Sequence, residues 1–118
     1  MKKHKQLQLY QGDIGLLEVT KLPQGARLVE TGRTVLAYGE SSGHHHVLHG
    51  SGVSRYELAK GAELVSYVEI AQALNDSGAL ALLEHPEHTT VQPPGGRIYK
   101  VLRQYEYRPS ALPQRVAD

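Results

Sequence analysis

Short segments of alternating or continuous apolar character, each about six to ten residues long, make up most of this chain. An alternation with a period of two is typical of a β-strand that buries one face, and short apolar runs between turns fit buried strands. The segments that we interpret as strands are Gln6–Tyr10, Ile14–Thr20, Ala26–Glu30, Thr34–Glu40, Ser54–Ala59, Glu63–Ile70, Ala79–Glu84 and Arg97–Tyr107.

Turn-forming residues separate these segments at frequent intervals. This frequent spacing of turns favours an all-β fold, either a small single-domain barrel or a sandwich such as a jelly roll. The segment Ile70–Asn75 leaves room for one short helix. The predicted turns are Gly12-Asp13, Pro23–Gly25, Thr31-Gly32, Ser41–Gly43, Gly50–Gly52, Lys60-Gly61, Asp76–Gly78 and Pro93–Gly96.

Length and composition narrow the class of protein further. A chain of 118 residues predicts a single domain, with residues 1–5 and 110–118 as flexible or surface-crossing ends. A formal charge of +1 argues against nucleic acid as the partner. We expect no membrane segment and no signal peptide, and the absence of cysteine suits a reducing cytoplasm. Exposed sheet edges would make a homodimer plausible.

The last strand places an arginine among tyrosines. Tyr99, Arg103 and Tyr105 share one face if Arg97–Tyr107 is extended. Such a face suits a ligand with a carboxylate or phosphate group, or stacking on a base. In the other interpretation, the tyrosines cover the edge of the core and Arg103 pairs with a carboxylate. The sequence leaves open which face is inside.

The first of two histidine clusters lies in Gly43–Gly50. In an extended chain His44 and His46 point to the same side, so that both could bind one metal ion. Glu40 precedes them across a turn and could act as a further ligand, an acceptor for a ligand, or a proton carrier. A histidine-rich surface loop that binds nothing is the alternative.

The second cluster is His85-Pro86-Glu87-His88. Proline in its second position favours a type I turn, which would bring His85 and His88 together. Glu87 would then lie at the exposed corner, as a nearby acid or base. The alternative is a polar turn with two exposed histidines.

Together the clusters predict a metal site formed by His44, His46, His85 and His88. Three histidines with an open position suit a catalytic metal, whereas four closed ligands suit a structural one. Nitrogen ligands favour zinc, iron, nickel or copper over magnesium or calcium.

The spacing of His44 and His46, followed by the turn Pro93–Gly96, resembles the cupin superfamily. That resemblance implies a small β-barrel with a metal site. The cupin pattern expects a glutamate where Gly50-Ser51 stand, and a histidine where Arg97–Tyr99 stand, so this chain would need its own ligand set.

The whole chain also resembles a small uncharacterised group of bacterial and phage proteins, over roughly residues 11 to 109. This resemblance implies no reaction. The shared elements are Gly12-Asp13, Gly39-Glu40, Gly43–His46, His85–His88, Pro94–Gly96 and Gln104–Tyr107.

Two functions from different classes follow. One is a metal-dependent enzyme that acts on a small molecule, with Glu40 or Glu87 as proton carrier. The other is a non-catalytic accessory protein that binds a protein partner and has a structural metal or none. The distance between the two histidine clusters decides whether a shared site is possible.

Overall fold

The architecture is an antiparallel β-sheet that curls into a nearly closed barrel. The computed structural model describes residues 6–37, 45–72, 80–103, 105–106 and 114–115. No helix occurs in these ranges, which confirms the expected all-β class. The strands in chain order are β1 (Gln8–Gln11), β2 (Ile14–Val19), β3 (Arg27–Ala37), β4 (His46–Lys60), β5 (Glu63–Ile70), β6 (Leu82–His85), β7 (His88–Val91), β8 (Arg97–Arg103), β9 (Tyr105–Glu106) and β10 (Gln114–Arg115).

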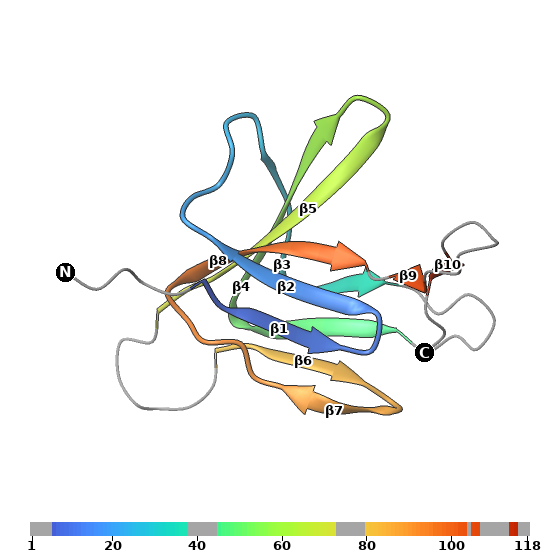
Figure 1. Ribbon diagram of the computed structural model, residues 1–118. Coiled ribbons are helices and arrows are strands. Elements are labelled where there is room, and N and C mark those ends of the chain that lie inside the picture. The colour runs from blue at the N-terminus through green and yellow to red at the C-terminus, as the bar shows by residue number, and fades with distance from the viewer. Residues whose placement is uncertain (1–5, 38–44, 73–79, 104, 107–113, 116–118) are drawn as a thin grey trace.

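The main sheet has the strand order β1-β2-β8-β5-β4-β6-β7, and β3 pairs with β4 outside that path. Its two ends, β1 and β7, meet at Gln11. The side-chain amide of Gln11 donates to the carbonyl oxygen of Thr89 in β7 at 2.9 Å and to that of Leu83 in β6 at 2.8 Å. Figure 1 shows β1 beside β6 and β7, so that the sheet curls back toward itself.

Strand β4 bends, and along one edge it pairs with two different strands. Val47–His49 pair with β6, and Val53–Lys60 pair with β5. The change occurs at the predicted turn Gly50–Gly52, which instead lies inside the strand. Gly50 has a φ of 149°, and a Cβ there would overlap the carbonyl oxygen of Leu80. The glycines therefore allow close backbone approach at a bend in the strand.

A second predicted turn is also part of a strand. Ala26–Glu30 and Thr34–Glu40 were expected as separate strands around Thr31-Gly32, but residues 27–37 form the single strand β3. The register against β4 shifts between Thr31 and Arg33, and Gly32 has a φ of 84°. This is a bulge whose extra residues lie on β4, because Gly32 alone faces residues 50–53 of β4 between the pairs Thr31–Ser54 and Arg33–His49.

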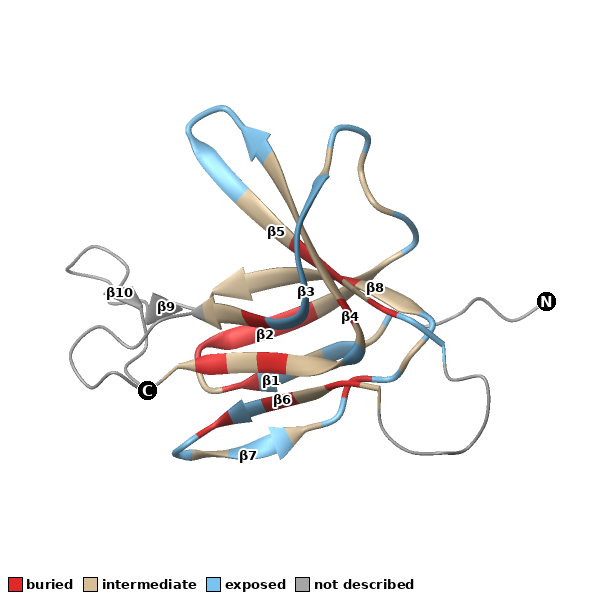
Figure 2. Ribbon diagram, turned by 180° about the vertical axis from the view of Figure 1, so that it is seen from behind, coloured by how far each residue is buried: buried red, intermediate tan, exposed pale blue. Residues whose placement is uncertain are grey.

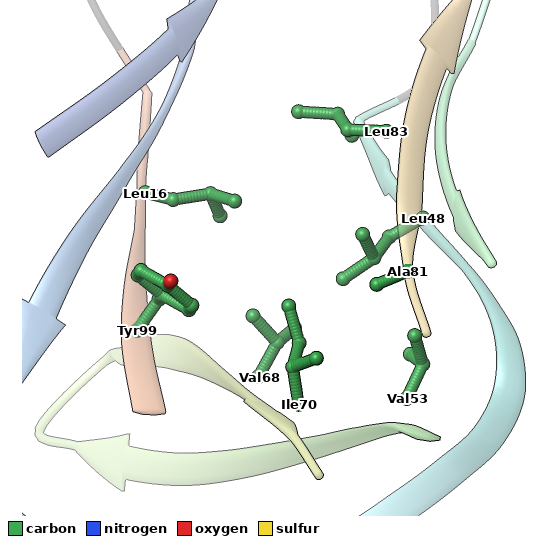
Figure 3. Packing of buried hydrophobic residues seen from close by; sticks show 8 residues of the cluster. All are labelled: Leu16, Leu48, Val53, Val68, Ile70, Ala81, Leu83 and Tyr99. Carbon is green, nitrogen blue, oxygen red and sulfur yellow. The ribbon is translucent and has the colours of Figure 1, made fainter. Parts of the chain in front are cut away.

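The core lies inside the curled sheet, and Figure 3 shows its side chains converging from several strands. Tyr99 settles which face of β8 is inside, because it is fully buried and Val101 packs beside it. In β4, Leu48 and Val53 lie on either side of the bend, and both are buried. The cluster consists of Leu16, Leu48, Val53, Val68, Ile70, Ala81, Leu83 and Tyr99.

The distal half of the β4–β5 hairpin projects away from this core (Figure 1). Figure 2 shows that its tip is exposed, in contrast to the buried positions of β2, β6 and β8. The hairpin turns at Lys60-Gly61, as the sequence predicted, and Lys60 pairs with Glu63. No helix in the described ranges is long and apolar enough to cross a membrane.

Candidate functional site

Three histidine rings from both sequence clusters meet at one end of the barrel. His46 is the first residue of β4, His85 ends β6, and His88 begins β7. The ring centres of His46 and His85 are 4.4 Å apart, those of His85 and His88 4.6 Å, and those of His46 and His88 5.9 Å. Figure 1 shows that the start of β4, the β1–β2 turn and the β6–β7 turn lie at this same end.

The β6–β7 turn brings its two histidines together as the sequence predicted. His85 and His88 are paired across it, with Pro86 and Glu87 at the exposed corner. The backbone N–H of Glu87 donates to Nδ1 of His85 at 3.0 Å. His85 is 6% exposed and shares the inward face of β6 with Leu83. Its side chain therefore closes the turn as well as lining the site.

His46 is fully buried, and both of its ring nitrogens face oxygen atoms. Nδ1 lies 3.0 Å from Oε1 of Gln11, and Nε2 lies 3.1 Å from Oδ1 of Asp13. Because the amide nitrogen of Gln11 donates to two carbonyl oxygens, reversing that amide would set its oxygen against both. Oε1 is therefore the atom that faces His46, and Nδ1 carries a proton.

Asp13 links the histidines to the last strand of the barrel. Its carboxylate is 2% exposed, and Oδ2 accepts a hydrogen bond from Nη2 of Arg103 at 3.3 Å. The guanidinium favours the ionised carboxylate, as a nearby positive charge does for any buried acid. A continuous polar chain thus runs from the carbonyls of β6 and β7 through Gln11, His46 and Asp13 to Arg103.

The ring centres have the spacing of a three-histidine metal site. An ion bonded at about 2.1 Å to an imidazole nitrogen lies about 3.2 Å from that ring's centre. The three measured separations define a point about 3 Å from each centre. Nevertheless, no group of three or more His, Asp and Glu side chains in the described ranges is arranged so that it could hold a metal ion.

The structure does not bring all of the predicted metal and acid–base residues into this cluster. His44 and Glu40 fall outside the residues that the structure describes, so the pairing of His44 with His46 stays a prediction. Glu87 is exposed at the turn. His49 pairs instead with Glu84 at the surface.

The predicted ligand-binding strand is divided between the core and the site. Tyr99 is buried, and its hydroxyl donates to the carbonyl oxygen of Pro94 at 2.9 Å. Burial raises the pKa of Tyr99 to about 12. Arg103 forms an ion pair with Asp13, which agrees with the alternative interpretation that Arg103 pairs with a carboxylate. Tyr105 is in β9, and its side chain lies outside the description.

Gln11 and Asp13 were not among the predicted site residues. Both are polar and buried, at 3% and 2% exposure, on either side of the turn at Gly12. A signal was present, because Gly12-Asp13 is one of the elements shared with the uncharacterised group that this chain resembles. Their contacts with His46, however, span more than thirty residues of chain.

Comparison with known proteins gives a family but no activity. No curated protein and no solved structure matches the chain. A family model described as a domain of unknown function, DUF8820, matches residues 10–104. The match includes the β1–β2 turn, all three converging histidines and Arg103, so that it contains the whole polar chain described above. The protein therefore belongs to the DUF8820 family.

Proposed function

We propose that this protein binds one divalent transition-metal ion through His46, His85 and His88, with Asp13 as the fourth donor. The observation that carries the proposal is the triangle of ring centres, whose separations of 4.4, 4.6 and 5.9 Å suit three imidazoles around one ion. Compared with the sequence prediction, Asp13 takes the position assigned to His44.

The surroundings of His46 support this role. A histidine that binds a metal usually donates its other ring nitrogen to a protein acceptor, which fixes the ring. Gln11 accepts from Nδ1 in this way and leaves Nε2 facing Asp13. Two donor atoms on a tetrahedral ion lie about 3.4 Å apart when the bonds are about 2.1 Å. The 3.1 Å between Nε2 and Oδ1 therefore needs to widen by only a few tenths of an ångström.

Metal binding requires a local adjustment at the β6–β7 turn. His85 uses Nδ1 to accept the N–H of Glu87, so its ring must turn before it can offer a lone pair to the ion. The torsion that turns an imidazole ring is broad, and catalytic sites often tighten only when their ligand binds. The proposal requires this adjustment, because no group in the described ranges could hold an ion with its side chains as they stand.

The donor set restricts the ion and its chemistry. Three imidazoles and one carboxylate favour zinc, iron, nickel or copper. With Asp13 bound, the ion has four protein donors and is structural; with Asp13 held by Arg103 alone, it has an open position for a small-molecule substrate. The exposed Glu87 is then the proton carrier.

The second candidate is an accessory protein in which this polar chain stabilises the barrel without metal. It is favoured by the hydrogen bonds of His46 and His85, which engage three of their ring nitrogens with protein groups. Buried polar groups that are fully satisfied can specify a unique core.

Metal content distinguishes the two functions. Tag-free protein should contain about one transition-metal ion per chain by elemental analysis, and the metal-free form should bind one zinc ion in a calorimetric titration. His88→Ala should weaken zinc binding by at least tenfold, because it removes a ligand. His49→Ala, at a surface ion pair, is the matched control and should bind as the parent does.

Zinc binding by His88→Ala equal to that of His49→Ala would contradict the proposed ligand set. The melting temperature of the metal-free protein then separates the two metal roles. A large loss of stability on metal removal indicates a structural ion. An unchanged fold indicates an ion with an open position.

A further inference from the structure

Strands β5 and β8 diverge on one side of the barrel. They pair only where Tyr67–Ile70 meet Arg97–Lys100. Beyond that point β5 follows β4 into the projecting hairpin, whereas β8 continues to Arg103 paired with β2 alone. Figure 1 shows this divergence as the wedge between the hairpin and β8.

A cleft of about 410 Å³ lies between the diverging strands. This volume is within the range of small-molecule sites, about 300–1,000 Å³. Leu36 of β3 and Val101 of β8 line it, and both pack against the core. Val65 and Ser66 of β5 form the opposite wall. The lining therefore combines apolar side chains with polar and charged groups.

The charges at the cleft favour an anion. Lys100 and Arg103 both line it, and among the described lining residues the one carboxylate is that of Glu63, which is exposed on the hairpin. Arg103 donates from Nη2 to Asp13, while its Nε is buried and has no hydrogen-bond acceptor among the described residues. A carboxylate or phosphate oxygen is the group that a guanidinium donor binds most strongly.

We propose that this cleft binds a small molecule with a carboxylate or phosphate group and a short apolar body. Arg103 and Lys100 hold the anionic group, and the body packs against Leu36, Val65 and Val101. The guanidinium of Arg103 also contacts Asp13, so that two residues, Arg103 and Asp13, separate the ligand from His46. Binding of the anion does not depend on the metal, and it is tested on metal-free protein.

The test uses three probes of similar shape: benzoate, phenyl phosphate and the neutral benzamide. In an NMR titration of the full chain, one or both anions should shift the amide signals of Glu63–Ser66 and Lys100–Arg103. The better anion should bind at least tenfold more tightly than benzamide, and the comparison between the two anions identifies the preferred group.

Two variants with a matched control complete the test. Lys100→Gln should weaken binding of the better anion by severalfold, whereas Lys21→Gln, at an exposed lysine of the β2–β3 connection, should leave it unchanged. Leu36→Trp should fill the cleft and abolish binding. Equal affinity for benzamide and both anions, shifts confined to other surfaces, or equal binding by the two lysine variants would overturn the proposal. These results are independent of the proposed metal site, so that a failure to bind zinc would leave the anion proposal standing.

Discussion

At the scale of single residues, Asp13 has the most demanding environment. It is almost fully buried and accepts a hydrogen bond from Arg103 on one oxygen while its other oxygen faces His46. An ionised carboxylate in such a position is stable only while its partners remain in place. Arg103, in turn, donates to Asp13 from Nη2.

Asp13→Ala should therefore destabilise the metal-free protein by about 3 kcal/mol, because it removes the buried carboxylate that accepts from Arg103 and faces His46. Glu84→Ala is the control, since Glu84 makes an exposed ion pair with His49. Its loss should cost less than about 1 kcal/mol. Urea denaturation of the two variants measures the difference. Equal losses would show that the Asp13 contacts contribute no more than a surface ion pair.

Tyr99 predicts a pH dependence of stability. Its pKa is about 12 in the folded protein, against an ordinary value of 10.0. Between these values the unfolded chain has lost the phenolic proton that the folded chain keeps, so the native state binds more protons and stability falls as the pH rises. The contribution is fully present below pH 10 and is lost progressively above it.

We expect the free energy of unfolding to fall by up to about 1.4 kcal/mol per pH unit from this group. Tyr99→Phe should lack that component, although it is less stable near neutrality because the hydrogen bond to Pro94 is absent. The measurement is denaturant unfolding of both proteins on either side of pH 10. Parallel curves for the two proteins would show that Tyr99 is not responsible.

At the scale of elements, Gln11 joins strands that the backbone leaves apart. It ends β1, and its amide bonds to β6 and β7 while its oxygen faces His46 of β4. One side chain thus connects the barrel closure to the histidine site. Loss of this connection should destabilise the β6–β7 hairpin first, because its outer strand β7 is otherwise paired with β6.

Gln11→Ala should destabilise the protein by about 2 kcal/mol and speed hydrogen exchange of the β6 and β7 amides. Gln8→Ala is the matched control, because Gln8 is an exposed residue of the same strand. Exchange in β6 and β7 that is equally slow in both variants would exclude a role for Gln11 in closing the barrel.

Alternating segments and short apolar runs between turns predicted most of the strands, because both patterns report burial. β7 was not predicted, since the polar sequence His88–Val91 is held by pairing with β6 instead of by an apolar face. The turns expected at Thr31-Gly32 and Gly50–Gly52 are a bulge and a bend. Glycine is typical of turns, of bulges and of bends within a strand, so that the local sequence does not distinguish them. The pairing with neighbouring strands does.

The candidate site was predictable only in part, for a related reason. His85 and His88 converge through a local turn that Pro86 predicts. Both clusters could be recognised because histidine is a common metal ligand. Gln11 and Asp13 reach His46 through the closure of the sheet, over 35 and 33 residues of chain. The sequence around Gln11 and Asp13 contains no local pattern that predicts such a contact.

At the scale of the whole molecule, closure of the barrel gathers residues from distant parts of the sequence at one end. The β1–β2 turn, the start of β4, the β6–β7 turn and the end of β8 each contribute to one polar chain. The diverging part of β5 and β8 opens a cleft beside the last member of this chain, Arg103. The proposed metal site and the proposed anion site are therefore linked through Asp13 and Arg103.

Anomalous diffraction at the zinc absorption edge, from crystals of the full chain loaded with one equivalent of zinc, tests the central claim most directly. We predict a single strong peak about 2.1 Å from a ring nitrogen of each of His46, His85 and His88, with Asp13 Oδ1 as the fourth donor. A zinc peak bound elsewhere, or rings that keep their present hydrogen bonds with no peak between them, would contradict the proposed metal site.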